Sequence, residues 1–353
     1  MAKKVILVDV PESAQKIPRD YAGYVFVSDI DKTYLATQID SVSGLLRAAF
    51  ETAERKSNVP GFSTILRAVR RGAIAEKARN PIYFVSASPP QIGTKILQKM
   101  EIDGVEHDGI IFKNQFEYLK RWNFKKLKEQ VGYKLGALLS LWKKLPKTCK
   151  LVLFGDDSES DAIIFSIFSE ILAKNISRIQ LVELLRHIGV FEEEALRVAW
   201  LARQAATEAL YPVQAAFINL DTGSNPAFYA RYGSNIFPTE NSLQTAFALF
   251  EQELIRDVAV ITIAKEMVLK YDYSPKDLLK SLEIAARRGL FTLETLDKLW
   301  PILARQSLLT PFVEREQREG AVTKLNPRRW NTQNLFKHSL SELKLRYRDE
   351  GRY

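Results

Sequence analysis

Short apolar runs recur through the first two thirds of the chain, and each is followed by a polar turn and a segment with helical spacing. Runs that are apolar at every position are typical of strands buried on both faces. Strands that alternate with helices predict an α/β fold, with a Rossmann-like parallel sheet and helices on both faces. The predicted strands are residues 24–27, 82–85, 109–112, 151–154 and 213–220, with one more in the N-terminal twenty residues.

Beyond residue 220 the pattern turns helical as far as about residue 308. Ser274 and Pro275 open one of these helices in the preferred order of cap and then proline, and Gly289 ends one. The pattern therefore predicts three parts. They are an α/β domain over residues 1–250 with a helical insert at about 176–210, a helical module over 251–320 and a basic tail over 321–353.

Two helical stretches, 189–204 and 289–306, resemble each other. Both contain Gly, Phe, Glu, Leu and Trp in the same order, and both reach Leu-Ala-Arg-Gln. A duplication and the convergence of two amphipathic helices both explain this. If it is a duplication, we expect twin helical hairpins that pack together as one module.

Composition excludes several classes of protein. The hydrophobic fraction of 46% is that of a globular protein, and no apolar run approaches the roughly 20 residues of a membrane span. The N-terminal segment is a poor secretory signal. A single cysteine, Cys149, excludes an internal disulfide framework and a four-cysteine zinc site, and three histidines make a histidine-rich metal site improbable on composition. We therefore expect a reducing compartment, the cytoplasm.

The net charge of +9 favours anionic partners, among them nucleic acid, phosphorylated ligands and acidic lipids. The tail over residues 321–353 has eight Lys or Arg against three acids, so it supplies +5 of that charge. A solvated tail and a binding tail both fit this composition.

Candidate chemistry begins directly after the first strand. Asp29 and Asp31 are two residues apart, and Thr33 follows at the same interval. Carboxylates at the end of a buried parallel strand lie where open α/β sheets bind ligands. One carboxylate could attack a phosphorus atom while the other moves the proton, and their mutual repulsion predicts a Mg²⁺ ion. A simple turn in which an Asp caps the next segment is the structural alternative.

Two further polar groups follow in order along the chain. Ser86 comes directly after the second strand, where its hydroxyl could contact a phosphoryl oxygen, while Ser88 suits a helix cap. Lys134 lies on a mostly apolar helix, so we select it over the solvated cluster Lys125, Lys126 and Lys128 as the ammonium that neutralises phosphate. Lys113 is the second choice.

An acidic cluster follows the fourth strand. Gly155 precedes Asp156 and Asp157, and Asp161 opens the next helix. Three carboxylates this close need a cation or wide solvent exposure. The helix dipole alone would account for two of them. Together the four stretches predict a phosphoryl-transfer site.

These motifs resemble those of the haloacid dehalogenase-like phosphatases. Over about residues 24–220, the segments DIDKT, NVPGF, YFVSASPPQ, Lys134 and GDDSESD look most like the catalytic domain of the actin-patch-protein type phosphatidate phosphatases. Lys32 stands where that family usually has a third Asp, and Pro90 replaces a Trp. The first departure should leave the nucleophile undisturbed, whereas the second bears on substrate preference.

The resemblance implies a role for each motif. Asp29 would be the nucleophile and Asp31 the general acid and base, with Thr33 supporting their loop. Ser86 and Lys134 would hold the phosphoryl group. The implied Mg²⁺ ligands are Asp29, Asp31 through its carbonyl, Asp156, and Asp157 or Asp161.

Three functions remain after this comparison. The first is a Mg²⁺-dependent phosphomonoesterase. Because residues 34–80 hold little more than helix, no large cap is expected, which favours a bulky substrate such as phosphatidate at an anionic membrane surface. The second is a nucleic-acid end-processing phosphatase, suggested by the tail and by the lysines and aromatics of 112–128. The third is a non-catalytic helical scaffold.

Overall fold

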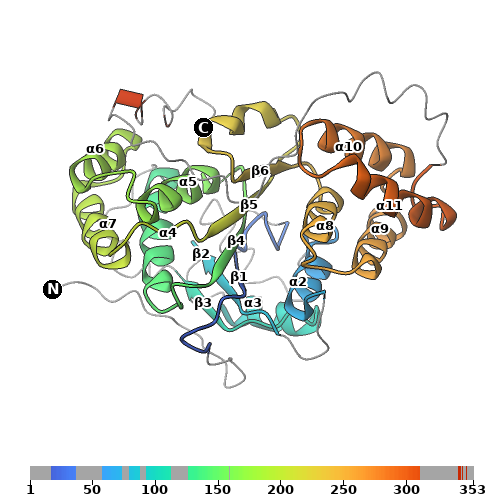
Figure 1. Ribbon diagram of the computed structural model, residues 1–353, viewed down its shortest axis with the longest axis horizontal. Coiled ribbons are helices and arrows are strands. Elements are labelled where there is room, and N and C mark those ends of the chain that lie inside the picture. The colour runs from blue at the N-terminus through green and yellow to red at the C-terminus, as the bar shows by residue number, and fades with distance from the viewer. Residues whose placement is uncertain are drawn as a thin grey trace.

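The structure is a computed structural model that describes most of the chain (Figure 1). The described residues are 17–36, 58–73, 79–87, 93–112, 126–158, 160–310, 341, 342, 344 and 347, with side chains omitted for 126–129.

A six-stranded sheet, parallel throughout, forms the centre of the molecule, with the strand order β3-β2-β1-β4-β5-β6. The strands are β1 (Tyr24–Ser28), β2 (Ile82–Ser86), β3 (Gly109–Phe112), β4 (Lys150–Asp156), β5 (Val213–Asn219) and β6 (Ile236–Thr239). The predicted Rossmann-like α/β fold is confirmed. All five strands expected from residue 24 onward are present.

Side chains along each strand alternate between two hydrophobic cores, as the period of two in a β-strand requires. On one face Phe154 lies between Phe26 and Phe217, with ring centroids 6.2 and 5.7 Å away. On the other face Val25 and Leu153 belong to the second core. Helices must therefore cover both faces.

The two layers of helices lie on either side of the sheet in Figure 1. The first core contains α2 (Phe62–Arg71), α3 (Gly93–Ile102), α8 (Ser242–Glu251), α9 (Asp257–Tyr271), α10 (Pro275–Arg287) and α11 (Leu293–Arg305). The second contains α4 (Lys126–Trp142), α5 (Asp161–Leu172), α6 (Arg178–Ile188) and α7 (Glu192–Ala205). A 3₁₀ helix, η5 (Pro226–Tyr232), connects β5 to β6.

The sequence prediction missed β6, because the region after residue 220 was expected to be helical. This strand has only four residues and contains Pro238, which cannot donate a ladder hydrogen bond. It lies at the edge of the sheet, where proline is tolerated. Short length and an internal proline together removed the usual strand signal.

The two similar stretches do form helical hairpins, α6–α7 and α10–α11, but these do not pack together. The first hairpin belongs to one core and the second to the other, so the sheet separates them. Their burial also differs. Leu196 is 45% exposed, whereas the corresponding Leu296 is fully buried. The expectation of a single module built from both hairpins is therefore wrong.

The described part of the basic tail packs against the α/β domain. Tyr347 is 2% exposed, its ring stacks on Tyr232, and its hydroxyl is 2.6 Å from Ser166 Oγ on α5. Lys344 forms an ion pair with Glu183 of α6. This end of the tail is thus part of the second core, and deleting the tail would remove a buried aromatic ring.

Several sequence predictions lie outside the described residues. They are the N-terminal strand up to residue 16, the stretches 37–57 and 74–78 of the helical interval 34–80, Ser88 and Lys113. The boundaries at residues 250 and 320 stay predictions, although the first core is continuous from β1 to α11. Among the helices that the structure describes, none has the length and apolarity to cross a bilayer.

We predict that Tyr347→Ala lowers the free energy of unfolding by about 3 kcal/mol, as expected for emptying a buried aromatic site. Tyr347→Phe, which keeps the ring and loses only the hydroxyl, should lower it by about 1 kcal/mol. Urea denaturation followed by circular dichroism measures both values. Equal stability of Tyr347→Ala and the wild type would show that the tail does not pack in this way.

Candidate active site

The site lies where the order of the strands reverses. Strand β1 has β2 on one side and β4 on the other, so the connections that leave β1 and β4 run to opposite sides and open a crevice at the carboxyl ends of these strands. Asp29 follows β1 directly, and Asp156 is the last residue of β4. The sheet topology therefore brings together two motifs that are more than one hundred residues apart in sequence.

Backbone contacts and one partly buried acid hold the loop after β1. The Asp29 amide donates to the Phe154 carbonyl at 2.9 Å, which continues the pairing of β1 with β4 past the end of the strand. Further on, Asp103 accepts hydrogen bonds from the Tyr34 hydroxyl at 2.5 Å and the Asn58 amide at 2.7 Å. The carboxylate of Asp103 thereby attaches the first motif to the segment before α2.

Lys134 is the cation at the centre of the site. It lies on the sheet-facing side of α4 with Val131 and Leu138, which are three and four residues away and also buried. Its ammonium is 2.9 Å from Asp29 Oδ1 and 2.6 Å from Asp161 Oδ1, and all three side chains are at most 3% exposed. The sequence-based choice of Lys134 thus falls on a lysine in contact with the candidate nucleophile.

Tyr133, the neighbour of Lys134, is partly buried against the second core. Burial raises the pKa of Tyr133 well above its usual range, and the charge of Lys134 acts in the opposite direction. The Tyr133 hydroxyl donates a hydrogen bond to the Ile111 carbonyl at 3.2 Å.

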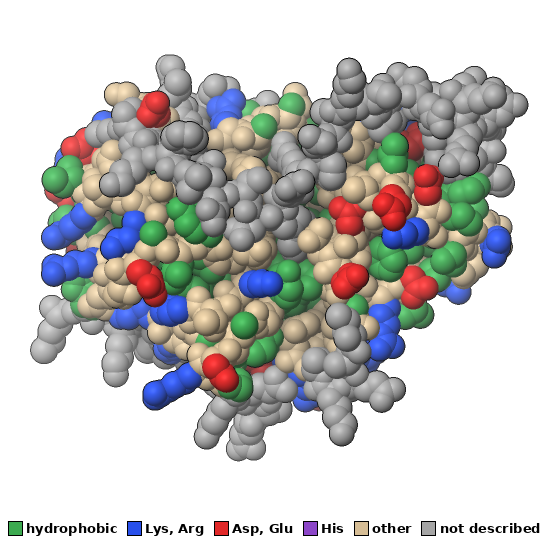
Figure 2. All heavy atoms as spheres, viewed as in Figure 1, with side chains coloured by type: hydrophobic (Ala, Val, Ile, Leu, Met, Phe, Trp, Pro, Cys, Tyr) green, Lys and Arg blue, Asp and Glu red, His purple; other side chains and the backbone are tan. Residues whose placement is uncertain are grey.

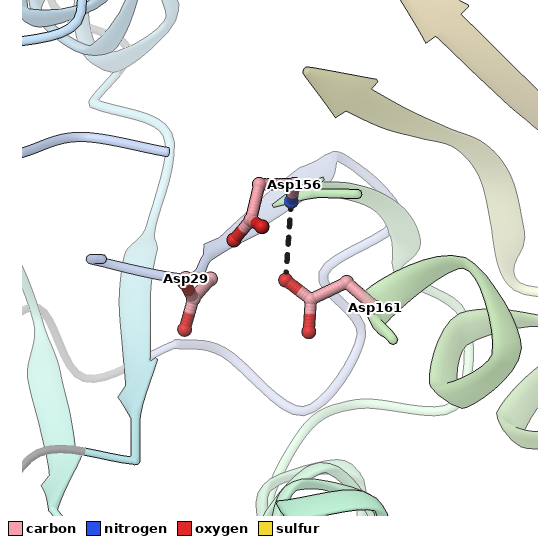
Figure 3. Close-up of side chains that lie close together, drawn as sticks. All are labelled: Asp29, Asp156 and Asp161. Atoms are coloured by element: carbon pink, nitrogen blue, oxygen red, sulfur yellow. Dashed lines mark hydrogen bonds between the residues drawn. The ribbon is translucent and has the colours of Figure 1, made fainter. Parts of the chain in front are cut away.

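Asp161 fixes the acidic loop to α5. Its second carboxylate oxygen accepts a hydrogen bond from the Asp156 amide at 3.2 Å (Figure 3). This approach requires Gly155, because a Cβ at that position would lie 2.4 Å from Asp161 Oδ2. The glycine of the fourth motif is thus needed for close packing, a reason that the sequence alone did not give.

Three carboxylates point toward one another in Figure 3: Asp29, Asp156 and Asp161. One oxygen from each lies within 4.8 Å of the others, and all three residues are buried. Carboxylate oxygens at this spacing are the donors that Mg²⁺ prefers. Both carboxylate oxygens of Asp161 already accept a contact, one from Lys134 and the other from the Asp156 amide, so Asp29 and Asp156 are the better candidates for metal ligands. The donor set therefore fits the predicted ion.

Asp31 and Ser86 meet beside this group. Ser86 Oγ lies 3.5 Å from Asp31 Oδ2, at the limit of a hydrogen bond, and both side chains are buried. Thr33 is fully buried in the same loop. The carboxylate of Asp31 lies outside the group of three. This position suits a proton-transfer role better than a role as a carboxylate ligand.

Asp157 is not part of the group either. Its carboxylate accepts hydrogen bonds from the Asp221 amide at 3.0 Å and from the Ser224 hydroxyl, both in the segment after β5. Sequence reasoning overlooked this segment, and it also overlooked Ser158, whose amide and hydroxyl both donate to Asp156 Oδ1. An Asp followed two residues later by a Ser is a signal for such a local turn.

Residues 24–186 match the family model described as "Phosphatidate phosphatase APP1, catalytic domain". The match begins at β1 and covers all of the candidate site residues, and it confirms the resemblance to the actin-patch-protein type phosphatidate phosphatases. No curated protein and no solved structure matches the chain. The family therefore supports a phosphatase.

We predict that Lys134→Met destabilises the protein by about 3 kcal/mol, because it leaves two buried carboxylates without their shared cation. The matched control is Lys143→Met, which alters an exposed lysine directly after the end of α4. Thermal denaturation should show a large decrease for the first variant and almost none for the second. Equal melting temperatures would contradict the buried ion pair.

Proposed function

We propose that this protein is a Mg²⁺-dependent phosphomonoesterase of the haloacid dehalogenase-like type, in which Asp29 becomes transiently phosphorylated. The observation that carries the proposal is the buried contact of Asp29 with Lys134 at the reversal point of the sheet, beside Asp156. A structural ion pair would not need further buried carboxylates around it. A nucleophile that receives a charged phosphoryl group does need a cation and metal ligands close by.

In the proposed first step, an oxygen of Asp29 attacks the phosphorus atom and the bond to the substrate alcohol breaks. Asp31 donates a proton to the leaving oxygen. In the second step, Asp31 takes a proton from water, the water oxygen attacks the phosphorus, and inorganic phosphate leaves with Asp29 regenerated. Lys134 and the Ser86 hydroxyl would bind phosphoryl oxygens throughout.

Asp29 and Asp156 would hold the Mg²⁺ ion, with the Asp31 carbonyl as a further ligand. When bound, the ion supplies positive charge that offsets the carboxylates and the dianionic phosphoryl group. Asp161 would act through its neighbours, since it orients both Lys134 and the Asp156 backbone.

Phosphatidate, or another phosphomonoester on a bulky support, is the proposed substrate class. One support is the matching family. The other is α2, the described helix between the first two motifs, which belongs to a core on one face of the sheet and does not form a cap over the site. On the face visible in Figure 2, basic side chains lie mostly over the α4–α7 half and acidic ones gather over the α8–α11 half. Contact with an anionic bilayer is therefore proposed for the α4–α7 side.

We predict that Asp29→Asn eliminates phosphate release, because an amide is neither a nucleophile nor a good metal ligand. Lys134 should keep its contact with Asp161, so the fold should persist in circular dichroism and thermal denaturation. Beryllofluoride with Mg²⁺ should raise the melting temperature of the wild type and leave that of the variant unchanged. Wild-type turnover by the variant would disprove the assignment of the nucleophile.

We also predict that Asp156→Ala abolishes turnover or strongly raises the Mg²⁺ concentration it requires. Excess chelator should stop the wild-type enzyme, and added Mg²⁺ should restore it. Phosphate release from a small chromogenic phosphate is the measurement. Full activity in chelator would remove the metal from the mechanism.

For the substrate, we expect a higher kcat/KM for phosphatidate in anionic vesicles than for sugar phosphates or nucleotides. Increasing salt should reduce vesicle binding more than it reduces hydrolysis of the small chromogenic phosphate. A strong preference for one soluble metabolite, without vesicle binding at moderate salt, would reject the lipid assignment and leave the phosphatase itself intact.

A further inference from the structure

A closed ring of hydrogen bonds joins the ends of β1, β4 and β5. The Lys32 ammonium donates to Asp221 Oδ2 at 2.6 Å, and the Asp221 amide donates to Asp157 Oδ1 at 3.0 Å. The Asp157 amide donates to the Asn219 carbonyl at 3.1 Å. The Asn219 side-chain amide then donates to the Lys32 carbonyl at 3.2 Å, which completes the ring.

The ring connects the two loops that carry the candidate chemistry. Lys32 directly follows Asp31, and Asp157 directly follows Asp156. The pairing of β1 with β4 ends at Ser28 and Phe154, so regular sheet hydrogen bonds do not reach these positions. The ring therefore links the loop after β1 to the loop after β4 through the segment that follows β5.

The backbone conformation of Lys32 indicates that the surrounding contacts hold this residue in place. Its φ angle is 56°, a left-handed conformation that a lysine adopts rarely. Such conformations persist where the surroundings hold them, and they cluster at functional sites. Lys32 is 17% exposed and Asp221 is 58% exposed, and ion pairs this close to solvent contribute little to stability. A contribution to the geometry of the site is the better explanation.

We propose that Lys32, Asp157 and Asp221 are positioning residues, which hold the loop of Asp31 at a fixed separation from the loop of Asp156. This inference rests on the proposed phosphatase function and names no new catalytic group. It gives Asp157 a role other than metal ligation, because both of its carboxylate oxygens accept hydrogen bonds from the segment after β5.

The first test concerns the ion pair of the ring. Lys32→Ala should lower kcat for a small chromogenic phosphate about tenfold, less than the roughly 100-fold that a 1 Å misplacement can cause. Lys32→Arg should retain most of the activity. Asp221→Ala should act like Lys32→Ala, and the double variant should be no slower than either one, because both remove the same contact.

Lys174→Ala is the matched control. Lys174 also has a φ of 56° and donates to a carbonyl, that of Thr207, but it follows α5 at the end remote from Asp161. Its replacement should leave kcat unchanged. If Lys174→Ala loses as much kcat as Lys32→Ala, the loss results from replacing a lysine at a positive φ and not from breaking the ring, and the proposal is wrong.

The second test separates positioning by Asp157 from metal ligation, with a readout that needs no turnover. Free Mn²⁺ measured by electron paramagnetic resonance reports metal binding to the protein alone. Asp157→Asn keeps an oxygen for the Asp221 amide, so it should bind Mn²⁺ as the wild type does. Asp157→Ala should weaken binding about tenfold, the low end for residues that orient metal ligands.

The outcomes distinguish the two proposals. If the wild type hydrolyses phosphomonoesters but Lys32→Ala, Asp157→Ala and Asp221→Ala match it in kcat and Mn²⁺ affinity, the ring has no positioning role. If Asp157→Asn loses as much Mn²⁺ affinity as Asp157→Ala, Asp157 is a ligand and the proposal is wrong. If the wild type lacks turnover, the phosphatase proposal fails. The positioning role of the ring is then judged by Mn²⁺ affinity alone, and it holds only if Asp157→Ala weakens binding while Asp157→Asn does not.

Discussion

The contact of one buried ammonium with two buried carboxylates is the interaction on which the other features of the site depend. Lys134 lies within 2.9 Å of both Asp29 and Asp161, where water cannot screen their charges. Burying a charge without a partner costs a large free energy, so the ammonium and both carboxylates must be buried in contact with one another. The fold therefore has to bring α4, β1 and the start of α5 to one point.

The topology of the sheet meets this requirement. Central strands that are apolar on both faces leave only their ends for polar groups, and the reversal between β1 and β4 opens space there. Gly155 allows Asp161 to approach the backbone of β4, and Asp161 in turn holds Lys134. Packing and charge are thus coupled, since a larger residue at position 155 would displace the partner of the lysine.

The sequence predicted those parts of the molecule that leave local patterns. Apolar runs followed by acids identified β1 and β4 with their carboxylates, and an isolated lysine on an apolar helix identified Lys134. It could not show that Asp157 turns toward Asp221, because that choice depends on a segment more than sixty residues away. The strand β6 was not predicted for a related reason. Its four residues gain strand structure from pairing with β5, which no local signal reports.

The same reasoning explains why the tail was assigned by its charge alone. Counting charges over residues 321–353 predicts an exposed segment, yet one aromatic side chain in it is almost fully buried. The ring of Tyr347 stacks on Tyr232, and its hydroxyl meets Ser166 on the helix that begins with Asp161. The burial of one side chain therefore depends on its own tertiary contacts and does not follow from the average charge of its segment. Because α5 carries Asp161 at one end and contacts Tyr347 partway along, the C-terminal residues belong to the framework that supports the site.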